Sequence, residues 1–236
     1  MITGYERPNL PETHYLDNRV FTDETILLEE LAHIFQRVWL FVCHESEVSR
    51  PGDFRTTSVA GKPIVIVRGT DGIVRSFYNV CRHRGAQVVR AGSGNAKAFQ
   101  CFYHLWTYGL DGRLKAVSKP EGYERVKLER DRLGLVPVRT ESVAGLLFVC
   151  LDDSADSLRD YLGEIVTPFL QPLGTVPLEV FHFHKAIIDT NWKLWQDNGS
   201  ERYHSFLHAI NRKPLPWVTE KTSPMRLHLC RNGHSG

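Results

Sequence analysis

The apolar residues after Thr22 follow a helical period. Positions three or four residues apart are apolar along the whole segment: Ile26, Leu27, Leu28, Leu31, Ile34, Phe35, Val38 and Trp39. This spacing places an apolar stripe on one face of a helix. Thr22, followed by the acidic pair Asp23 and Glu24, has the pattern of an N-cap. We therefore expect an amphipathic helix here, whose stripe packs on the domain that follows.

From Pro51 onward the pattern changes to short apolar runs. They are rich in β-branched and aromatic residues and alternate with turn dipeptides such as Gly61-Lys62 and Asp71-Gly72. That alternation predicts strands and hairpins. The expected strands cover residues 54–59, 63–68, 73–80, 98–103, 114–117, 135–139 and 146–151. Together they indicate one small β domain.

The chain beyond this region changes character again. Residues 158–170 have helical spacing, and the proline-containing connection 171–177 suggests a domain boundary nearby. Residues 178–189 alternate in polarity and predict a strand with His182 and His184 on one face. A histidine pair on a strand without a third ligand is usually structural, and we interpret this pair so.

Charge and composition exclude several kinds of partner. The 236 residues include 29 Lys and Arg against 27 Asp and Glu, a formal charge of +2. This balance favours neither nucleic acid nor an anionic membrane as a partner. No apolar run approaches the ~20 residues that cross a bilayer, and the N-terminus has no signal-peptide pattern. We expect a cytoplasmic protein whose partners are small molecules and other proteins.

Two short runs each combine a cysteine with a histidine. They are Cys81-Arg82-His83 and Cys101-Phe102-Tyr103-His104, with 17 residues between them. One thiolate and one imidazole per loop suit a Rieske [2Fe-2S] cluster, in which one iron takes two cysteines and the other takes two histidines. Two Cys and two His would also suit a structural zinc ion. The order within both runs, and a chain length that needs no metal to fold, favour the cluster.

The other cysteines give no sign of a disulfide framework. Cys43, Cys150 and Cys230 are odd in number and widely separated along the chain. We expect them to be buried free thiols.

A second candidate centre lies in the segment 191–208. At 100° per residue, Glu201, His204 and His208 fall within a ~60° sector of one helix face. Two imidazoles one turn apart can supply two adjacent ligands of a 2-His-1-carboxylate iron site, which leaves positions open for O2. The structural alternative is an amphipathic helix whose histidines face solvent.

Both motifs resemble those of Rieske-type aromatic ring-hydroxylating oxygenases, large (alpha) subunit. Around the cluster ligands the similarity covers residues 81–85 and 101–108. In the second motif, Asn-Trp-Lys at 191–193 precedes the iron ligands, as in the family. Neither cluster loop has the additional cysteine of respiratory-chain Rieske proteins, so the resemblance is to the ferredoxin and oxygenase branch. It covers most of the chain, from Val20 to His208.

The resemblance implies an α+β fold in three parts. An N-terminal arm and helix would occupy residues 1–44, and a Rieske β-sandwich domain would occupy 45–155. The beginning of a helix-grip catalytic domain, an antiparallel sheet that holds the iron helix, would occupy 156–236.

The resemblance also implies individual roles. Four residues would hold the [2Fe-2S] cluster, and two would bind a mononuclear Fe(II): Cys81, His83, Cys101 and His104 for the cluster, and His204 and His208 for the iron. Asn198 would lie close to the iron. Glu201 would bridge the two centres, at a position where most relatives have Asp and some Rieske monooxygenases of non-aromatic substrates have Glu.

The implied activity is that of a terminal oxygenase component. Electrons from NAD(P)H would reach the cluster through a reductase, with or without a ferredoxin, and would pass to the iron of a neighbouring protomer. O2 would then hydroxylate, and most simply dihydroxylate, an aromatic compound. A homotrimer or an assembly with a small subunit is implied.

Three alternatives remain open. A Rieske monooxygenase of a non-aromatic substrate would use the same two centres, whereas a stand-alone Rieske electron carrier would not need the residues of the iron motif. A zinc-stapled binding module is the third alternative.

The chain departs from the family pattern at two points. Leu105 stands where many relatives have glycine. The family's third iron ligand is a downstream carboxylate, and after His208 this chain has only Glu220 as an acidic residue. We therefore expect an N-terminal fragment that lacks the third ligand and is inactive alone.

Overall fold

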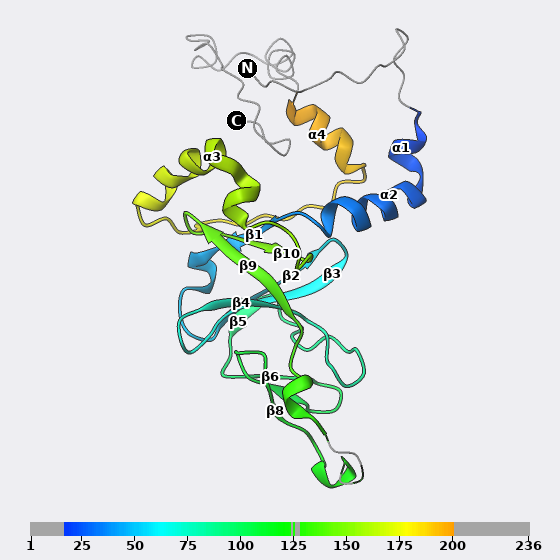
Figure 1. The fold of residues 1–236 in the computed structure, drawn as a ribbon, viewed down its shortest axis with the longest axis vertical. Coiled ribbons are helices and arrows are strands. Elements are labelled where there is room, and N and C mark those ends of the chain that lie inside the picture. Colours follow the sequence, from blue (N-terminus) through cyan, green and yellow to red (C-terminus); the bar gives the residue numbers. More distant parts are fainter. Residues whose placement is uncertain (1–16, 124, 126–127, 201–236) are drawn as a thin grey trace. The chain divides into compact units, whose positions relative to one another are not determined.

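The computed structural model describes residues 17–123, 125 and 128–200. The chain divides into two units, Glu29–Phe183 and Met1–Leu28 together with His184–Gly236. All described strands belong to the larger unit, which Figure 1 shows as β-sheet with few helices. The domain boundaries expected after residues 44 and 155 stay predictions.

A seven-stranded antiparallel sheet forms most of the larger unit. Its strand order is β1-β10-β9-β4-β3-β2-β5. The strands are β1 (Leu40–His44), β2 (Asp53–Val59), β3 (Lys62–Arg68), β4 (Val74–Tyr78), β5 (Ser93–Asn95), β9 (Pro137–Val143) and β10 (Leu146–Cys150). A second sheet has the order β6-β7-β8, with β6 (Phe99–Gln100), β7 (Thr107–Tyr108) and β8 (Leu114–Ala116).

Two apolar cores lie on opposite faces of strand β3. Its residues Ile64 to Val67 are all fully buried, which requires cover on both faces of the strand. Because successive side chains point to opposite faces, Val65 and Val67 lie in one core. Ile64 and Ile66 lie in the other, together with Leu147 and Val149 of β10. A continuous β-branched run is thus explained by a strand buried on both faces.

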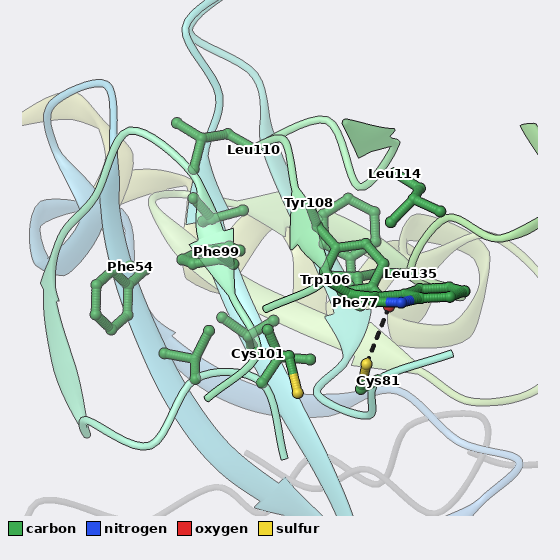
Figure 2. Close-up of a cluster of buried hydrophobic side chains, with 14 residues drawn as sticks. Phe54, Phe77, Cys81, Phe99, Cys101, Trp106, Tyr108, Leu110, Leu114 and Leu135 are labelled. Atoms are coloured by element: carbon green, nitrogen blue, oxygen red, sulfur yellow. Dashed lines mark hydrogen bonds between the residues drawn. The ribbon is translucent and has the colours of Figure 1, made fainter. Parts of the chain in front are cut away.

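The core around Val65 and Val67 joins the two sheets and carries both cysteines of the candidate centre. Figure 2 shows its aromatic side chains, with Cys81 and Cys101 at the same end of the group. Phe54 of the large sheet meets Phe99 of the small sheet edge to face, with ring centroids 5.6 Å apart. Such pairs add ~0.5–1.5 kcal/mol to the stabilisation that comes from burying their area.

The described helices are short. They are α1 (Arg19–Thr22), α2 (Glu24–Glu30), α3 (Leu158–Leu170) and α4 (Trp192–Ser200), with a π-helical turn at Leu31–Phe35. Turns of 3₁₀ helix cover Glu45–Val48, Pro120–Tyr123, Arg130–Arg132 and Gln171–Thr175. The prediction of a helix over 158–170 is confirmed: the hydroxyl of Ser157 caps it, and Gly163 kinks it. None of these helices is long and apolar enough to cross a membrane.

Two predictions for helix and strand are wrong. Thr22 is not an N-cap but the last residue of α1. Asp23 takes the capping role, because its carboxylate accepts hydrogen bonds from the backbone N and the hydroxyl of Thr25. Residues 178–189 form no strand; their side chains are exposed and no strand pairs with them.

The cysteines outside the candidate centre are buried free thiols, as expected, where the structure describes them. Cys43 and Cys150 are buried and free. Burial raises the pKa of the Cys43 thiol to about 11, so it stays protonated at neutral pH. Cys230 lies outside the described residues.

Candidate metal centre

The two ligand-bearing loops come from different sheets. Cys81 and His83 follow β4 of the large sheet, and Cys101 and His104 lie in the hairpin between β6 and β7 of the small sheet. Only the second pair therefore lies in a hairpin. The first pair lies on the connection from β4 to β5, two strands that do not pair with each other.

Despite this difference, the two loops have the same backbone pattern. In each, the cysteine N–H donates to the carbonyl five residues later, and the cysteine carbonyl accepts from the N–H four residues later. The four hydrogen bonds are Cys81 to Ala86 (2.8 Å), Gly85 to Cys81 (2.9 Å), Cys101 to Trp106 (2.8 Å) and Leu105 to Cys101 (2.9 Å). Gly85 and Leu105 occupy equivalent positions, both with positive φ, +74° and +59°. The loops thus present their cysteines in matching local frames.

The cysteines are buried and the histidines lie against each other. Cys81 is 3% exposed and Cys101 is 1% exposed. The imidazole rings of His83 and His104 have centroids 4.6 Å apart and meet at 77°. The structure brings all four predicted ligands to one end of the domain, as two cysteines and two histidines.

His83 has the properties of a metal ligand. Its Nδ1 atom is buried and has no hydrogen-bond partner in the described part of the chain. Burial, followed by the charges of His104 and Arg84, lowers the pKa of His83 and favours the neutral imidazole, which is the form that binds metal. A buried ring nitrogen without a partner is costly unless a bound group satisfies it.

The arrangement of the four side chains bears on the kind of metal group that they could hold. Among the described residues, no group of three or more His, Cys, Asp or Glu side chains surrounds one ion position. A binuclear cluster does not need such a group, because each of its irons takes two protein ligands. The donor set therefore fits a Rieske cluster, with thiolates on one iron and imidazoles on the other.

Three polar side chains that sequence reasoning missed support the loops. The Tyr108 hydroxyl lies 3.2 Å from Sγ of Cys81 and accepts a hydrogen bond from the Arg82 N–H. The Asn79 side chain exchanges two hydrogen bonds of 2.8 Å with the backbone of Val89. The Ser118 hydroxyl donates to the carbonyl of His104 at 2.6 Å. The only sequence signal was their position close to the ligands.

Comparison with known proteins decides the family. Residues 38–129 match the family model of the Rieske [2Fe-2S] domain. Over 229 residues the chain is 46% identical to the alpha subunit of 2-aminobenzenesulfonate 2,3-dioxygenase from Alcaligenes sp., covering 96% of this chain and 58% of that protein. The chain belongs to the Rieske aromatic ring-hydroxylating oxygenase alpha subunits.

Other members of the family are similar in sequence and in fold. Over 216 residues this chain is 42% identical to the hydroxylase alpha subunit of methanesulfonate monooxygenase from Methylosulfonomonas methylovora, covering 87% of this chain and 52% of that protein. The solved structure of naphthalene 1,2-dioxygenase from Rhodococcus sp. bound to indole matches with a TM-score of 0.75 at 34% identity, covering 80% of this chain and 44% of that chain. This Rieske oxygenase chain spans about half the length of the curated relatives it matches.

The comparisons bear on two of the three alternatives, the zinc-stapled module and the stand-alone electron carrier. The matching model is that of a [2Fe-2S] domain, so a Rieske cluster is supported and the zinc staple is not. The relatives named above are oxygenase alpha subunits, which disfavours a stand-alone electron carrier.

The second predicted centre is only partly described in this Rieske oxygenase chain. Asn198 is exposed on α4. Glu201, His204 and His208 lie outside the described residues, so their common helix face stays a prediction.

Proposed function

We propose that Cys81, His83, Cys101 and His104 hold a Rieske [2Fe-2S] cluster. The observation that carries this proposal is the pair of matching loops, which brings two buried cysteines and two adjacent imidazoles to one end of the domain. When bound, such a cluster accepts and gives up one electron at a time. The chain's own contribution is to hold the two imidazoles against each other and to shield both sulfurs from water.

The same proposal assigns a mononuclear Fe(II) site to the segment after α4. His204 and His208 would be iron ligands, Asn198 would lie close to the iron, and Glu201 would link the two centres. The support is the motif from Asn191 to His208, together with a similarity to oxygenase alpha subunits that extends over 96% of the chain. Residues 156–236 would begin a helix-grip catalytic domain.

As the reaction, we propose hydroxylation of an aromatic compound by O2 with electrons derived from NAD(P)H. A reductase, with or without a ferredoxin, would deliver the electrons, and the subunit would work as a homotrimer or with a small subunit. The 2-aminobenzenesulfonate dioxygenase relative supports dihydroxylation of an aromatic ring.

A second candidate is monooxygenation of a non-aromatic sulfonate. The methanesulfonate monooxygenase relative and the glutamate at position 201 favour it. Both relatives are named for a sulfonate substrate. We therefore propose that the substrate carries a sulfonate group in either case.

The cluster is tested on this chain directly. Protein purified in air is analysed for iron and acid-labile sulfide, and the dithionite-reduced protein is examined by EPR. We expect two irons and two sulfides per cluster and the low average g-value that histidine ligation gives. Zinc without sulfide would contradict the proposal.

The iron site and the reaction need separate experiments. His204→Ala and His208→Ala should each lose mononuclear iron while the cluster EPR signal stays; loss of both signals would indicate misfolding. In the complete alpha subunit supplied with its reductase, turnover of an aminobenzenesulfonate under ¹⁸O2 should place two labelled atoms in the product. A single labelled atom would favour the monooxygenase, and turnover of naphthalene alone would contradict the sulfonate proposal.

A further inference from the structure

Trp106 lies on one cluster loop but contacts the histidine of the other. It follows the ligand His104 by two residues, yet its indole ring stacks on the imidazole of His83. The centroids are 4.9 Å apart, and the planes are within 10° of parallel. Trp106 is 3% exposed and belongs to the core that joins the two sheets.

Two contacts hold the Trp106 indole ring in place, one through its backbone and one through the ring of Tyr123. The Trp106 carbonyl accepts the hydrogen bond of the Cys101 N–H that closes the second loop. Tyr123, on the 3₁₀ turn after β8, meets the indole edge to face with centroids 6.2 Å apart. The ring is therefore a rigid surface against which the imidazole lies. Figure 2 shows Trp106 among the buried side chains of the core that also contains Cys81.

No hydrogen bond in the described part of the chain orients the buried side of His83. Its Nδ1 has no partner, and the buried indole Nε1 of Trp106 has none either. The χ2 torsion of histidine is intrinsically broad, so an imidazole without a hydrogen bond takes its ring orientation from packing. For His83 the closest parallel ring is that of Trp106.

The second histidine has a different environment. Tyr103 lies over the imidazole of His104, with centroids 3.8 Å apart, but Tyr103 is 54% exposed. His104 thus meets a solvent-facing ring from its own loop, whereas His83 meets a buried ring from the opposite loop. The two histidines are inequivalent in how firmly their planes are held.

We propose that Trp106 is a positioning residue for His83. The stacked indole fixes the plane in which the imidazole meets its iron, and the electronic structure and reduction potential of the histidine-bound iron depend on that stack. This inference rests on the proposed cluster at Cys81, His83, Cys101 and His104. Trp106 acts through His83 and takes no part as a ligand.

The test compares aromatic and non-aromatic residues at position 106. Trp106→Leu and Trp106→Met remove the planar stack, and Trp106→Phe keeps a ring that can face His83. Trp39→Leu is the matched control, because Trp39 is equally buried but lies in the separate core against α3. For each protein we would measure iron and sulfide content, the EPR g-values of the reduced cluster and the midpoint potential.

We expect the non-aromatic variants to keep the cluster but to show shifted or broadened g-values and a midpoint potential outside the scatter of wild-type titrations. Trp106→Phe should lie closer to wild type than either, and Trp39→Leu should match wild type. A fully loaded Trp106→Leu or Trp106→Met with wild-type g-values and potential would overturn the inference.

Failure to load the cluster is also decisive. If neither non-aromatic variant loads while Trp106→Phe and Trp39→Leu do, a ring facing His83 is required and the inference stands. If Trp106→Phe also fails to load, the role of Trp106 is structural and the inference is overturned. Absence of any Rieske signal in the wild-type protein would instead contradict the proposed function.

Discussion

The hydroxyl of Tyr108, on β7 of the small sheet, lies 3.2 Å from Sγ of Cys81, on the loop that follows β4 of the large sheet. The Arg82 N–H already donates to the oxygen of this hydroxyl at 3.0 Å, so the hydroxyl hydrogen is available to the sulfur. Burial, followed by the contact with Cys81, raises the pKa of Tyr108 and keeps it protonated. Tyr108 is therefore a built-in hydrogen-bond donor to one thiolate of the proposed cluster.

Tyr108→Phe should lower the midpoint potential of the cluster. The reduced cluster carries one more negative charge, so a donor to its sulfur stabilises the reduced state more than the oxidised state. If the difference is about 0.5–1.5 kcal/mol, the fall is ~20–65 mV for a one-electron couple. Redox titration followed by EPR measures it, and a potential unchanged from wild type would show that the hydroxyl does not bond to the sulfur.

Asn79→Ala should destabilise the loop that carries Cys81 and His83. Asn79 is fully buried, and its side chain pairs with both the N–H and the carbonyl of Val89 across that loop. The Gln87 side chain also reaches the Val89 carbonyl, so the substitution leaves one buried N–H without a partner. We expect a loss of about 1–3 kcal/mol in the free energy of unfolding and faster release of iron to a chelator.

Gln87→Ala is the control for this effect. Gln87 is exposed and shares only the Val89 carbonyl, so its loss should change stability less than that of Asn79. Urea denaturation and chelator kinetics of both variants decide between a specific role of the Asn79 amide and general sensitivity of the loop. Equal losses in the two variants would indicate the latter.

Leu105→Gly and Gly85→Ala should have opposite effects on stability. Leu105 holds φ at +59° with its side chain half exposed, and a left-handed backbone costs a residue with Cβ ~1–2 kcal/mol. Part of that gain is offset by the extra freedom that glycine gives the unfolded chain, so we expect Leu105→Gly to stabilise by about 0.5–1 kcal/mol.

The equivalent glycine isolates the backbone contribution. A Cβ on Gly85 would meet no atom within 4 Å, so Gly85→Ala adds backbone strain without a steric clash. Because alanine also restricts the unfolded chain, which offsets part of the strain, we expect a loss of about 0.5–1 kcal/mol. Chemical denaturation of the two variants measures both signs. A Leu105→Gly protein less stable than wild type would mean that the leucine side chain makes contacts that outweigh its strain.

Asp71→Asn should reduce stability at neutral pH but not in acid. Arg75, followed by the backbone N–H of Ile73, lowers the pKa of the Asp71 carboxyl to about 2. Because the folded pKa lies below the unfolded value of ~3.9, the carboxylate contributes stability above pH ~4 that is lost as the pH falls towards ~2. Asn can still accept from Ile73 but cannot pair with the charge of Arg75.

Urea denaturation as a function of pH tests this prediction. The gap between wild type and Asp71→Asn should be present at pH ~7 and close between pH ~4 and ~2. Asp131→Asn, on the exposed 3₁₀ turn Arg130–Arg132, controls for the general loss of an acidic group. A gap that persists unchanged in acid would assign the effect to turn geometry instead of charge.

The sequence predicted those elements whose residues repeat a clear period. Strands β2, β3, β8 and β10 and helix α3 occur within two residues of the predicted ranges. The range 98–103 shortened to Phe99–Gln100, because Cys101 already belongs to the ligand loop. The short strands β5 and β7 have too few residues to show alternation, and β1 follows directly on the predicted helix, so none of them was expected.

The sequence predicted only those features of the site that depend on residues close together along the chain. The spacing of the Cys and His pairs identified the four ligand candidates without any structure. The contacts from Tyr108 to Cys81 and from Trp106 to His83 join residues more than 20 positions apart, and no sequence period reports such pairs. The equivalence of Leu105 and Gly85 likewise follows from hydrogen bonds that only the folded loops display.

Cys81 and His83 lie on the loop that follows β4 of the large sheet, and Cys101 and His104 lie on the β6–β7 loop of the small sheet. A bound cluster would therefore link the two sheets through its ligands. Metal-binding free energy is folding free energy where the ligands are brought together by the fold. A newly made chain that has not received its metal holds the small sheet only by the apolar core and by hydrogen bonds such as that from Arg82 to Tyr108. We therefore expect proteases to remove iron-starved chains first, so that the cellular supply of iron governs how long each copy of this protein survives.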